Sequence, residues 1–488
     1  MNTQTACLAW AEEEFGSAQL NDRRNEVRLV SMAGTLAHNA HVLVASSFPN
    51  MTEREAAYDF LENDRIAPQG ITRACACATA RRSTSYPFVH IPIDQSTLTL
   101  RDAQGRRRVG PVGARASGAR GLECMTAIAV SPTGIPLGIA AQSFWARDEL
   151  PPEKRSEKRS VEDRESRFWG EVRTEARRAF ETTAPGVRRW FQMDRGADAW
   201  MVILDAAERE DEWTTVRASA DRAGWAGHSG VREAESRAQL WSLLNAQPLR
   251  GRYAFEVRAS KTRQARTAQM EIRFAAVTLD LLLTPSNKRR ASADVWAVHA
   301  REIASSCPAG ETPIEWMLLT THPVTDENAA CRVIAGYALR WRIEDFHKQW
   351  KGGGLDVEQT QVVDRAPVER WLRLLASVAM RTLRLTHMAR TEGERPASDE
   401  FDVYELEALR VTRASFGQST PTVLTMHVLL TLLGELGGHV NGKRNAPGPK
   451  ILARALQRIT PLAEGLRQLE ADGRILPLSR SPANQRRN

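Results

Sequence analysis

Apolar residues recur at helical spacing through the first part of the chain. They include Leu8, Phe15, Leu20, Val27, Val30, Met32 and Leu36. This spacing predicts short helices over residues 1–70, which form a small helical domain. Arg28 lies near the start of a predicted helix, where a basic side chain can enter a DNA groove. Small helical bundles without that role are at least as common.

Near Pro87 the pattern changes to short apolar runs bounded by turn residues. The first runs are 88–94, 125–130, 136–141, 187–193 and 213–216. They predict strands, and the turn residues 131–134 predict a hairpin. A second β-rich stretch at about 230–320 contains runs at 253–257, 269–274, 277–279 and 316–319. We interpret this stretch as an inserted β subdomain.

Helical spacing returns after the second β-rich stretch. A long helix is expected from near Asp326, and further helices around 366–390, 402–410 and 421–436. The pattern therefore predicts an α/β protein with one helical domain at the N-terminus and another at the C-terminus. The expected parts are a domain at 1–70, a core at 71–365 that contains the insertion, a helical domain at 366–478 and a disordered tail at 479–488.

Composition agrees with a folded protein. The chain has 488 residues, 42% hydrophobic and 26% charged, which excludes a fully disordered or fibrous chain. The best candidate for a membrane span, 423–440, is interrupted by His427 and Glu435, and the N-terminus does not resemble a secretory signal. The spacing of the six cysteines fits neither a disulfide framework nor a zinc site. We therefore expect a soluble cytoplasmic protein.

Positive charge is concentrated in two places. The formal net charge is +8. Residues 441–488 hold ten basic residues against three acids, and residues 101–121 hold six arginines against Asp102. Such clusters favour a phosphate-rich partner, because each neutralised phosphate releases counterions. For the C-terminal cluster, a solvated basic tail is an equally good interpretation.

Two aspartates follow predicted strands. Asp94 comes after the run 88–93 and Asp194 after the run 187–193. Carboxylates delivered by separate strands of one sheet are what a Mg²⁺ site needs. An acid at the end of a strand is, however, more often a turn former or a helix cap.

A stripe of charged residues follows on the predicted long helix. Tyr337, Arg340, Glu344, His347 or Lys348, and Lys351 recur at steps of three and four residues. One carboxylate among several cations suggests a metal ligand beside phosphate-binding groups. A salt-bridged surface helix, in which Arg340 and Glu344 simply pair, explains the stripe equally well.

The stripe resembles the Y-x2-R-x3-E-x6-K signature of bacterial cut-and-paste DDE transposases of the insertion-sequence-four family. Residues 93–97 and 193–198 resemble the family's two aspartate motifs, and residues 10–15 and 57–61 resemble its end-binding domain. The segment 436–444 resembles its dimerisation region. Asp59 and the Arg- and Gly-rich stretch 101–121 depart from the family pattern.

The resemblance implies a ribonuclease-H-like catalytic core whose metal-binding catalytic residues are Asp94, Asp194 and Glu344. It implies two Mg²⁺ ions, with Mn²⁺ as a possible substitute, because both accept oxygen ligands. Its further DNA contacts are expected at Tyr337, Arg340, His347, Lys348, Lys351, Arg217 and Trp316. Trp316 would hold a flipped base, although it can equally be a plain β-core residue.

The resemblance also implies a reaction and partners. The enzyme would nick the terminal inverted repeats of a transposon, form and reopen hairpins, and join the 3′ ends to target DNA, as a homodimer in the bacterial nucleoid. Two alternatives stay open. One is a catalytically silent DNA-binding regulator derived from a transposase, and the other is a structure-specific nuclease.

Overall fold

The computed structural model describes most of the chain. The described residues are 6–113, 118–148, 165–228, 236–257, 259, 263–284, 289–352, 355–439, 447 and 449–478. The expected tail at 479–488 and residues 440–444 of the C-terminal segment lie outside them. Within the described residues, no helix is both long enough and apolar enough to cross a membrane.

The N-terminal region is helical, as its spacing predicted. Its helices are α1 (Ala6–Phe15), α2 (Arg23–Asn39), α3 (Val44–Ser47), α4 (Met51–Glu62) and α5 (Pro68–Ser83). Asp22 and Asn50 cap α2 and α4 by accepting hydrogen bonds from backbone N–H groups of the first helical turn. The helical region therefore extends through α5, beyond the boundary expected near residue 70.

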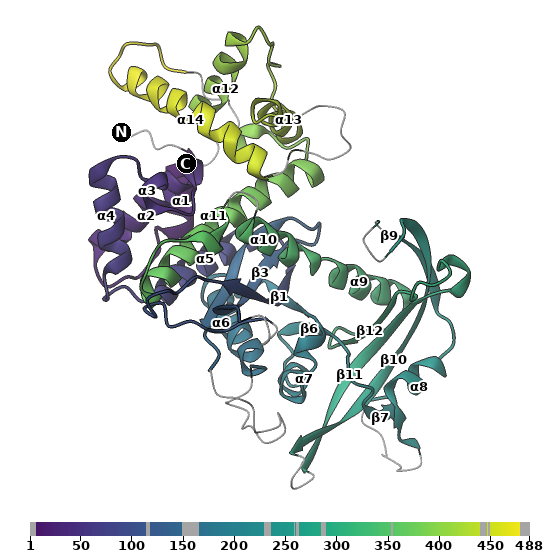
Figure 1. Ribbon diagram of the computed structural model, residues 1–488. Helices are drawn as coiled ribbons and strands as arrows, with labels where there is room; N and C mark the ends of the chain where they lie inside the picture. Colours follow the sequence, from purple (N-terminus) through teal and green to yellow (C-terminus); the bar gives the residue numbers. More distant parts are fainter. Residues whose placement is uncertain are drawn as a thin grey trace.

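A mixed twelve-stranded sheet forms the centre of the molecule (Figure 1). Its strands are β1 (Phe88–Thr99), β2 (Gly110–Pro111), β3 (Arg120–Val130), β4 (Pro136–Trp145), β5 (Arg188–Met193), β6 (Glu212–Arg217), β7 (Ala223–Ala226), β8 (Ala238–Gln239), β9 (Gly251–Val257), β10 (Arg266–Thr284), β11 (Arg289–Glu302) and β12 (Glu315–Thr320). The main strand order is β2-β3-β1-β5-β6-β12-β11-β10-β7-β8, while β4 pairs with β3 and β9 pairs with β10.

Strand β1 is the point at which the strand order changes direction: the strand that follows in the antiparallel part lies on one side of β1, and the later parallel strands lie on the other side. Strands β1, β3 and β4 are antiparallel neighbours, and the predicted turn at 131–134 joins β3 to β4. Helix α6 (Arg167–Thr183) then leads to β5, which lies on the other side of β1 and runs parallel to it. Helix α7 (Trp200–Ala207) connects β5 to β6, which is again parallel. Ligands of such sheets bind beyond the carboxyl ends of the strands at the point of reversal.

The strands of the predicted insertion continue the same sheet. Strand β12 pairs with β6 on one side and with β11 on the other. Strands β10 and β11 form a long hairpin that extends away from the N-terminal helices, with α8 (Leu240–Asn245) beside it (Figure 1). The two predicted runs at 269–274 and 277–279 are therefore parts of one strand, β10.

The expected long helix is divided into two. Asp326 caps α9 (Glu327–Ala338), as the predicted start requires, but α9 ends before α10 (Trp341–Lys351) begins. Between them, the N–H groups of Leu339 and Arg340 donate to carbonyl groups three residues earlier, which tightens the backbone locally. The prediction of one continuous helix was wrong at this turn.

The remaining helices form the C-terminal region. They are α11 (Arg365–Thr391), α12 (Val403–Ser415), α13 (Met426–Leu436) and α14 (Pro449–Ala471). The first three match the expected helices, although α12 extends further and α13 starts later. Helix α11 passes beside the N-terminal helices before the chain enters the C-terminal group (Figure 1).

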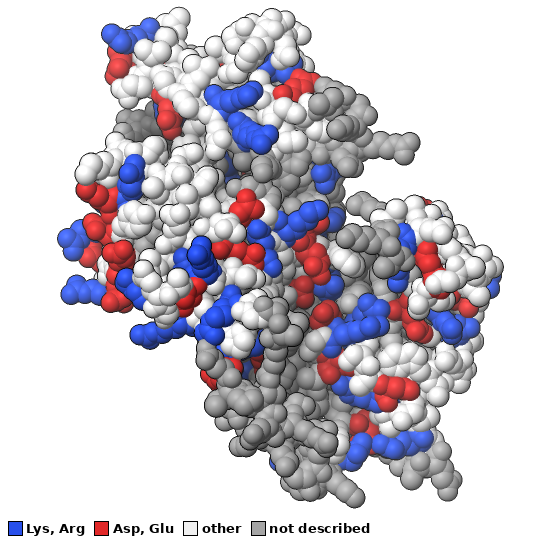
Figure 2. Space-filling model, viewed as in Figure 1, with Lys and Arg blue, Asp and Glu red and all other residues white. Residues whose placement is uncertain are grey.

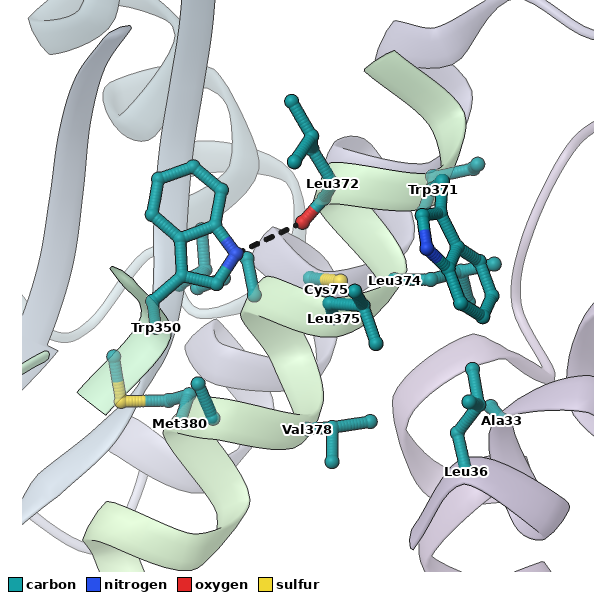
Figure 3. Close-up of a cluster of buried hydrophobic side chains, with 14 of the residues drawn as sticks. Ala33, Leu36, Cys75, Trp350, Trp371, Leu372, Leu374, Leu375, Val378 and Met380 are labelled. Atoms are coloured by element: carbon teal, nitrogen blue, oxygen red, sulfur yellow. Dashed lines mark hydrogen bonds between the residues drawn. The ribbon is translucent and has the colours of Figure 1, made fainter. Parts of the chain in front are cut away.

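A buried apolar cluster fixes the position of α10. Trp350 of α10 packs among side chains of α11, and its indole N–H donates to the carbonyl oxygen of Leu372 at 3.2 Å (Figure 3). On the other side of α11, Trp371 lies beside Leu36 of α2. Because indole burial with a satisfied N–H is strongly favourable, this packing orients the face of α10 that carries Glu344.

The arginines of the stretch 101–121 are partly used within the protein. Arg106 pairs with Asp364 at 2.5 Å, and Arg107 donates to the backbone oxygens of residues 360 and 362. Arg120 donates to the backbone oxygen of Val109. On the face seen in Figure 2, basic and acidic side chains are interspersed. Charge alone therefore does not outline a DNA path on this face.

Candidate active site

The sheet brings Asp94 and Asp194 to neighbouring positions. The parallel pairing of β1 with β5 ends at the pair Ile93 and Met193, so both aspartates follow directly after it. Asp194 leaves β5, and its Oδ1 accepts a hydrogen bond from the backbone N–H of Gly196 at 2.7 Å. The sequence placed the Asp94 carboxylate at the end or edge of a strand; β1 instead continues to Thr99 by pairing with β3, and only its pairing with β5 ends before Asp94.

Glu344 approaches Asp94 from α10. Oxygen atoms of Asp94 and Glu344 and a ring nitrogen of His347 all lie within 4.8 Å of one another. The guanidinium of Arg340 lies between the two carboxylates, at 3.5 Å from an oxygen of each. The suggested pairing of Arg340 with Glu344 therefore exists, but Arg340 also contacts Asp94 and is only 8% exposed, whereas the Glu344 side chain is 42% exposed.

The surroundings of the Asp94 carboxylate disfavour its ionised form, mainly because it is buried. Burial raises the pKa of Asp94 to about 7, with the charges of Glu344 and Asp194 adding to the rise and Arg340 opposing it. Asp194 thus acts on Asp94 electrostatically, although it is not part of the trio above. A site of this kind favours a bound cation.

The residues fit a divalent metal ion. Carboxylate oxygens of Asp94 and Glu344 are hard ligands that converge on one point, and Asp194 emerges from the adjacent strand. The buried Nε2 of His347 has no hydrogen-bond partner in the described part of the chain. Burial, together with the charges of Lys351 and Arg340, lowers the pKa of His347 to about 3, so its ring is neutral.

Of three further predicted DNA contacts, Tyr337 and Trp316 are buried and Arg217 is half-buried. Tyr337 is 3% exposed and Trp316 is 7% exposed, and their rings meet edge to face with centroids 5.5 Å apart. Phe255 packs against the other side of Trp316. Arg217 of β6 donates to the backbone oxygen of Glu315 at 2.8 Å.

Arg340 and His347 are buried in the cluster, but three other predicted contacts are more accessible. Lys351 is partly exposed at the end of α10, where its ammonium donates to the backbone oxygen of Thr97 at 2.6 Å and lies 3.6 Å from Glu358. Lys348 is exposed on α10, and Arg28 is exposed on α2. Lys348 and Arg28 can therefore reach a ligand without rearrangement of the protein.

Sequence reasoning placed His347 among weak DNA contacts and did not foresee its position beside two carboxylates. A signal was present, because Glu344 and His347 are three residues apart and so share one face of a helix. The convergence with Asp94 depends on how α10 packs over β1, which local spacing does not reveal.

Comparison with known families identifies one part of the chain. Residues 8–66 match the family described as transposase DNA-binding. The match covers helices α2, α3 and α4 and most of α1. It supports a transposase DNA-binding function for the N-terminal region and DNA as a partner of the protein.

Proposed function

We propose that the protein is a cut-and-paste DDE transposase with a ribonuclease-H-like catalytic core. The observation that carries the proposal is the convergence of acids from separate elements. Asp94 and Asp194 follow the paired ends of two parallel strands, and Glu344 reaches Asp94 from α10. The transposase DNA-binding match at residues 8–66 supports the same conclusion independently.

Asp94, Asp194 and Glu344 would hold the divalent ions, proposed as two Mg²⁺ with Mn²⁺ as a substitute. When bound, such ions activate the attacking oxygen and stabilise the leaving oxygen of phosphoryl transfer. Arg340 keeps the carboxylates of Asp94 and Glu344 in position by its contacts to both. Lys351, at the end of the same helix, supplies positive charge for a DNA phosphate.

The proposed reaction has four steps at each transposon end. Water cuts one strand, the freed 3′ hydroxyl attacks the opposite strand to form a hairpin, water reopens the hairpin, and the 3′ hydroxyl attacks target DNA. The proposed assembly is a homodimer on terminal inverted repeats. A base-holding role of Trp316 requires that DNA binding exposes its ring, which is enclosed by Phe255 and Tyr337.

The test uses DNA that carries the inverted repeats flanking the gene, incubated with the protein, Mg²⁺ and a target plasmid. We expect hairpins, released ends and joined products with the wild type. We expect DNA binding without cleavage from Glu344→Ala. Asp345→Asn is the matched control, because this neighbouring acid pairs with Arg342 and His387 outside the cluster.

The products separate the proposal from its alternatives. End binding without any cleavage by the wild type would identify a regulator. Cleavage of branched DNA that leaves free ends and no joined product would identify a nuclease. Cleavage that persists in Glu344→Ala would contradict the assignment of Glu344.

A further inference from the structure

A histidine belongs to the acid cluster. His347 lies one helical turn after Glu344 on α10, and its ring nitrogen shares the 4.8 Å cluster with oxygens of Asp94 and Glu344. Its side chain is enclosed, with 7% of the residue exposed, and the Phe346 ring lies beside it at 5.5 Å between centroids. The imidazole is therefore held in place by its surroundings.

The Nε2 atom of His347 lacks a hydrogen-bond partner in the described part of the chain. Most buried polar atoms in native proteins have a hydrogen-bond partner, and leaving one unpaired costs free energy. Simple core packing does not account for a buried imidazole that has an unpaired nitrogen and presents a ring nitrogen to two carboxylates. A ligand that accepts both nitrogen and oxygen donors does account for it.

We propose that His347 is a ligand, through a ring nitrogen, of the metal ion held by Asp94 and Glu344. The inference rests on the proposed function, because it concerns the same metal site. A glutamate and a histidine three residues apart on one helix are an established way to present two ligands to one ion. Asp94 supplies the third ligand from β1.

The nitrogen ligand changes which ion the site prefers. Mg²⁺ binds hard oxygen ligands and is demanding about octahedral geometry, whereas imidazole binds transition metals more readily. A site with two carboxylates and one imidazole therefore favours Mn²⁺ over Mg²⁺ more strongly than a site made of carboxylates alone.

The direct test is pulsed electron paramagnetic resonance of Mn²⁺ bound to the full-length protein without DNA. A coordinated imidazole produces a ¹⁴N modulation in the spectrum of the wild type. We expect this modulation in the wild type and its loss in His347→Gln. Bound Mn²⁺ without ¹⁴N modulation in the wild type would overturn the proposal even if every variant failed to fold.

Affinity measurements complete the test. We expect Mn²⁺ affinity to fall about tenfold or more in His347→Gln, while the affinity for Mg²⁺, measured by displacement of Mn²⁺, changes much less. His322→Gln is the matched control, because His322 is equally buried and also has an unpaired ring nitrogen, yet it stacks on Trp190. Equal losses in both variants would contradict the proposal.

A third result would have a different meaning. If the wild type bound Mn²⁺ no better than Glu344→Gln does, the metal site itself would be absent, and the proposed function would fail together with the role of His347. Tight binding without a nitrogen ligand would remove only the role of His347. The two failures are therefore distinguishable.

Discussion

Two buried acids at opposite ends of the parallel strands have opposite surroundings. Glu212 begins β6, where Arg173 and Arg177 donate hydrogen bonds to its carboxylate and Arg189 lies 3.8 Å away. Asp94, near the carboxyl ends, shares the single guanidinium of Arg340 with Glu344.

These surroundings shift the pKa values of the two acids in opposite directions. Burial alone would raise the pKa of Glu212, but the hydrogen bonds and charges of Arg177 and Arg173 outweigh it and lower the pKa. Burial raises the pKa of Asp94 to about 7. The comparison teaches that Glu212 is fully compensated and holds the fold together, whereas the Asp94 cluster retains capacity for a cation.

The largest effect is expected from Asp94→Asn. Cleavage of transposon-end DNA should fall by on the order of 10³-fold or more, because a metal ligand is lost. The melting temperature should stay the same or rise, because the variant removes a poorly compensated buried charge. Single-turnover cleavage and thermal unfolding measure the two effects. A strong loss of stability would make the Asp94 cluster structural, like that of Glu212.

Glu212→Gln should show the reverse behaviour. It leaves the buried guanidinium groups of Arg173 and Arg177 without their shared carboxylate, which should cost about 3–5 kcal/mol of unfolding free energy. Urea unfolding measures this loss. Cleavage per folded molecule should remain close to that of the wild type, and its disappearance would assign Glu212 to the catalytic machinery.

Glu405 extends the comparison to a third buried acid. Burial and the charge of Asp402 raise the pKa of Glu405 from 4.5 to about 7. The folded state therefore binds this proton more tightly than the unfolded state, so the contribution of Glu405 to stability is greatest below pH 4.5 and is lost as the pH rises through about 7. Glu405→Gln should stabilise the protein at pH 8 by about 1–3 kcal/mol and have little effect at pH 4.5. Thermal unfolding at the two pH values checks this difference, and an equal effect at both would contradict it.

The smallest effect is expected from Lys351→Ala. Removal of one phosphate contact should reduce the slope of log affinity against log salt by about 0.9 for duplex DNA. Filter binding over a series of salt concentrations measures the slope. Arg178→Ala, at an exposed position of α6 that pairs with Glu175, should leave it unchanged. The same slope in Lys351→Ala as in the wild type would place Lys351 outside the DNA path.

Local patterns predicted the strands that lead to Asp94 and Asp194. They also predicted a helix start near Asp326, although Glu344 lies on the next helix, α10. The continuation of β1 beyond Asp94 was missed because it depends on pairing with β3, far along the chain. Likewise, the pairing of β12 with β6 joins the expected insertion to the core sheet through a contact that no local pattern specifies.

The sequence predicted which residue types form the candidate site. It did not predict how these residues are arranged in space. Spacing marked Arg340 and Glu344, yet it did not predict the turn between α9 and α10 or the contact of Arg340 with Asp94. The unpaired Nε2 of His347 is visible only once α10 has been packed against the sheet. These features depend on tertiary contacts, which override local helical periodicity.

The most direct test of the metal site is local chain cleavage by Fe²⁺ and ascorbate, which produces radicals wherever Fe²⁺ is bound. The account predicts cuts close to Asp94, Asp194 and Glu344 that excess Mg²⁺ suppresses, and none close to Glu212. Cuts near Glu212, or cleavage without any preferred position, would contradict the claim that the Asp94 cluster is the one that binds the divalent ion.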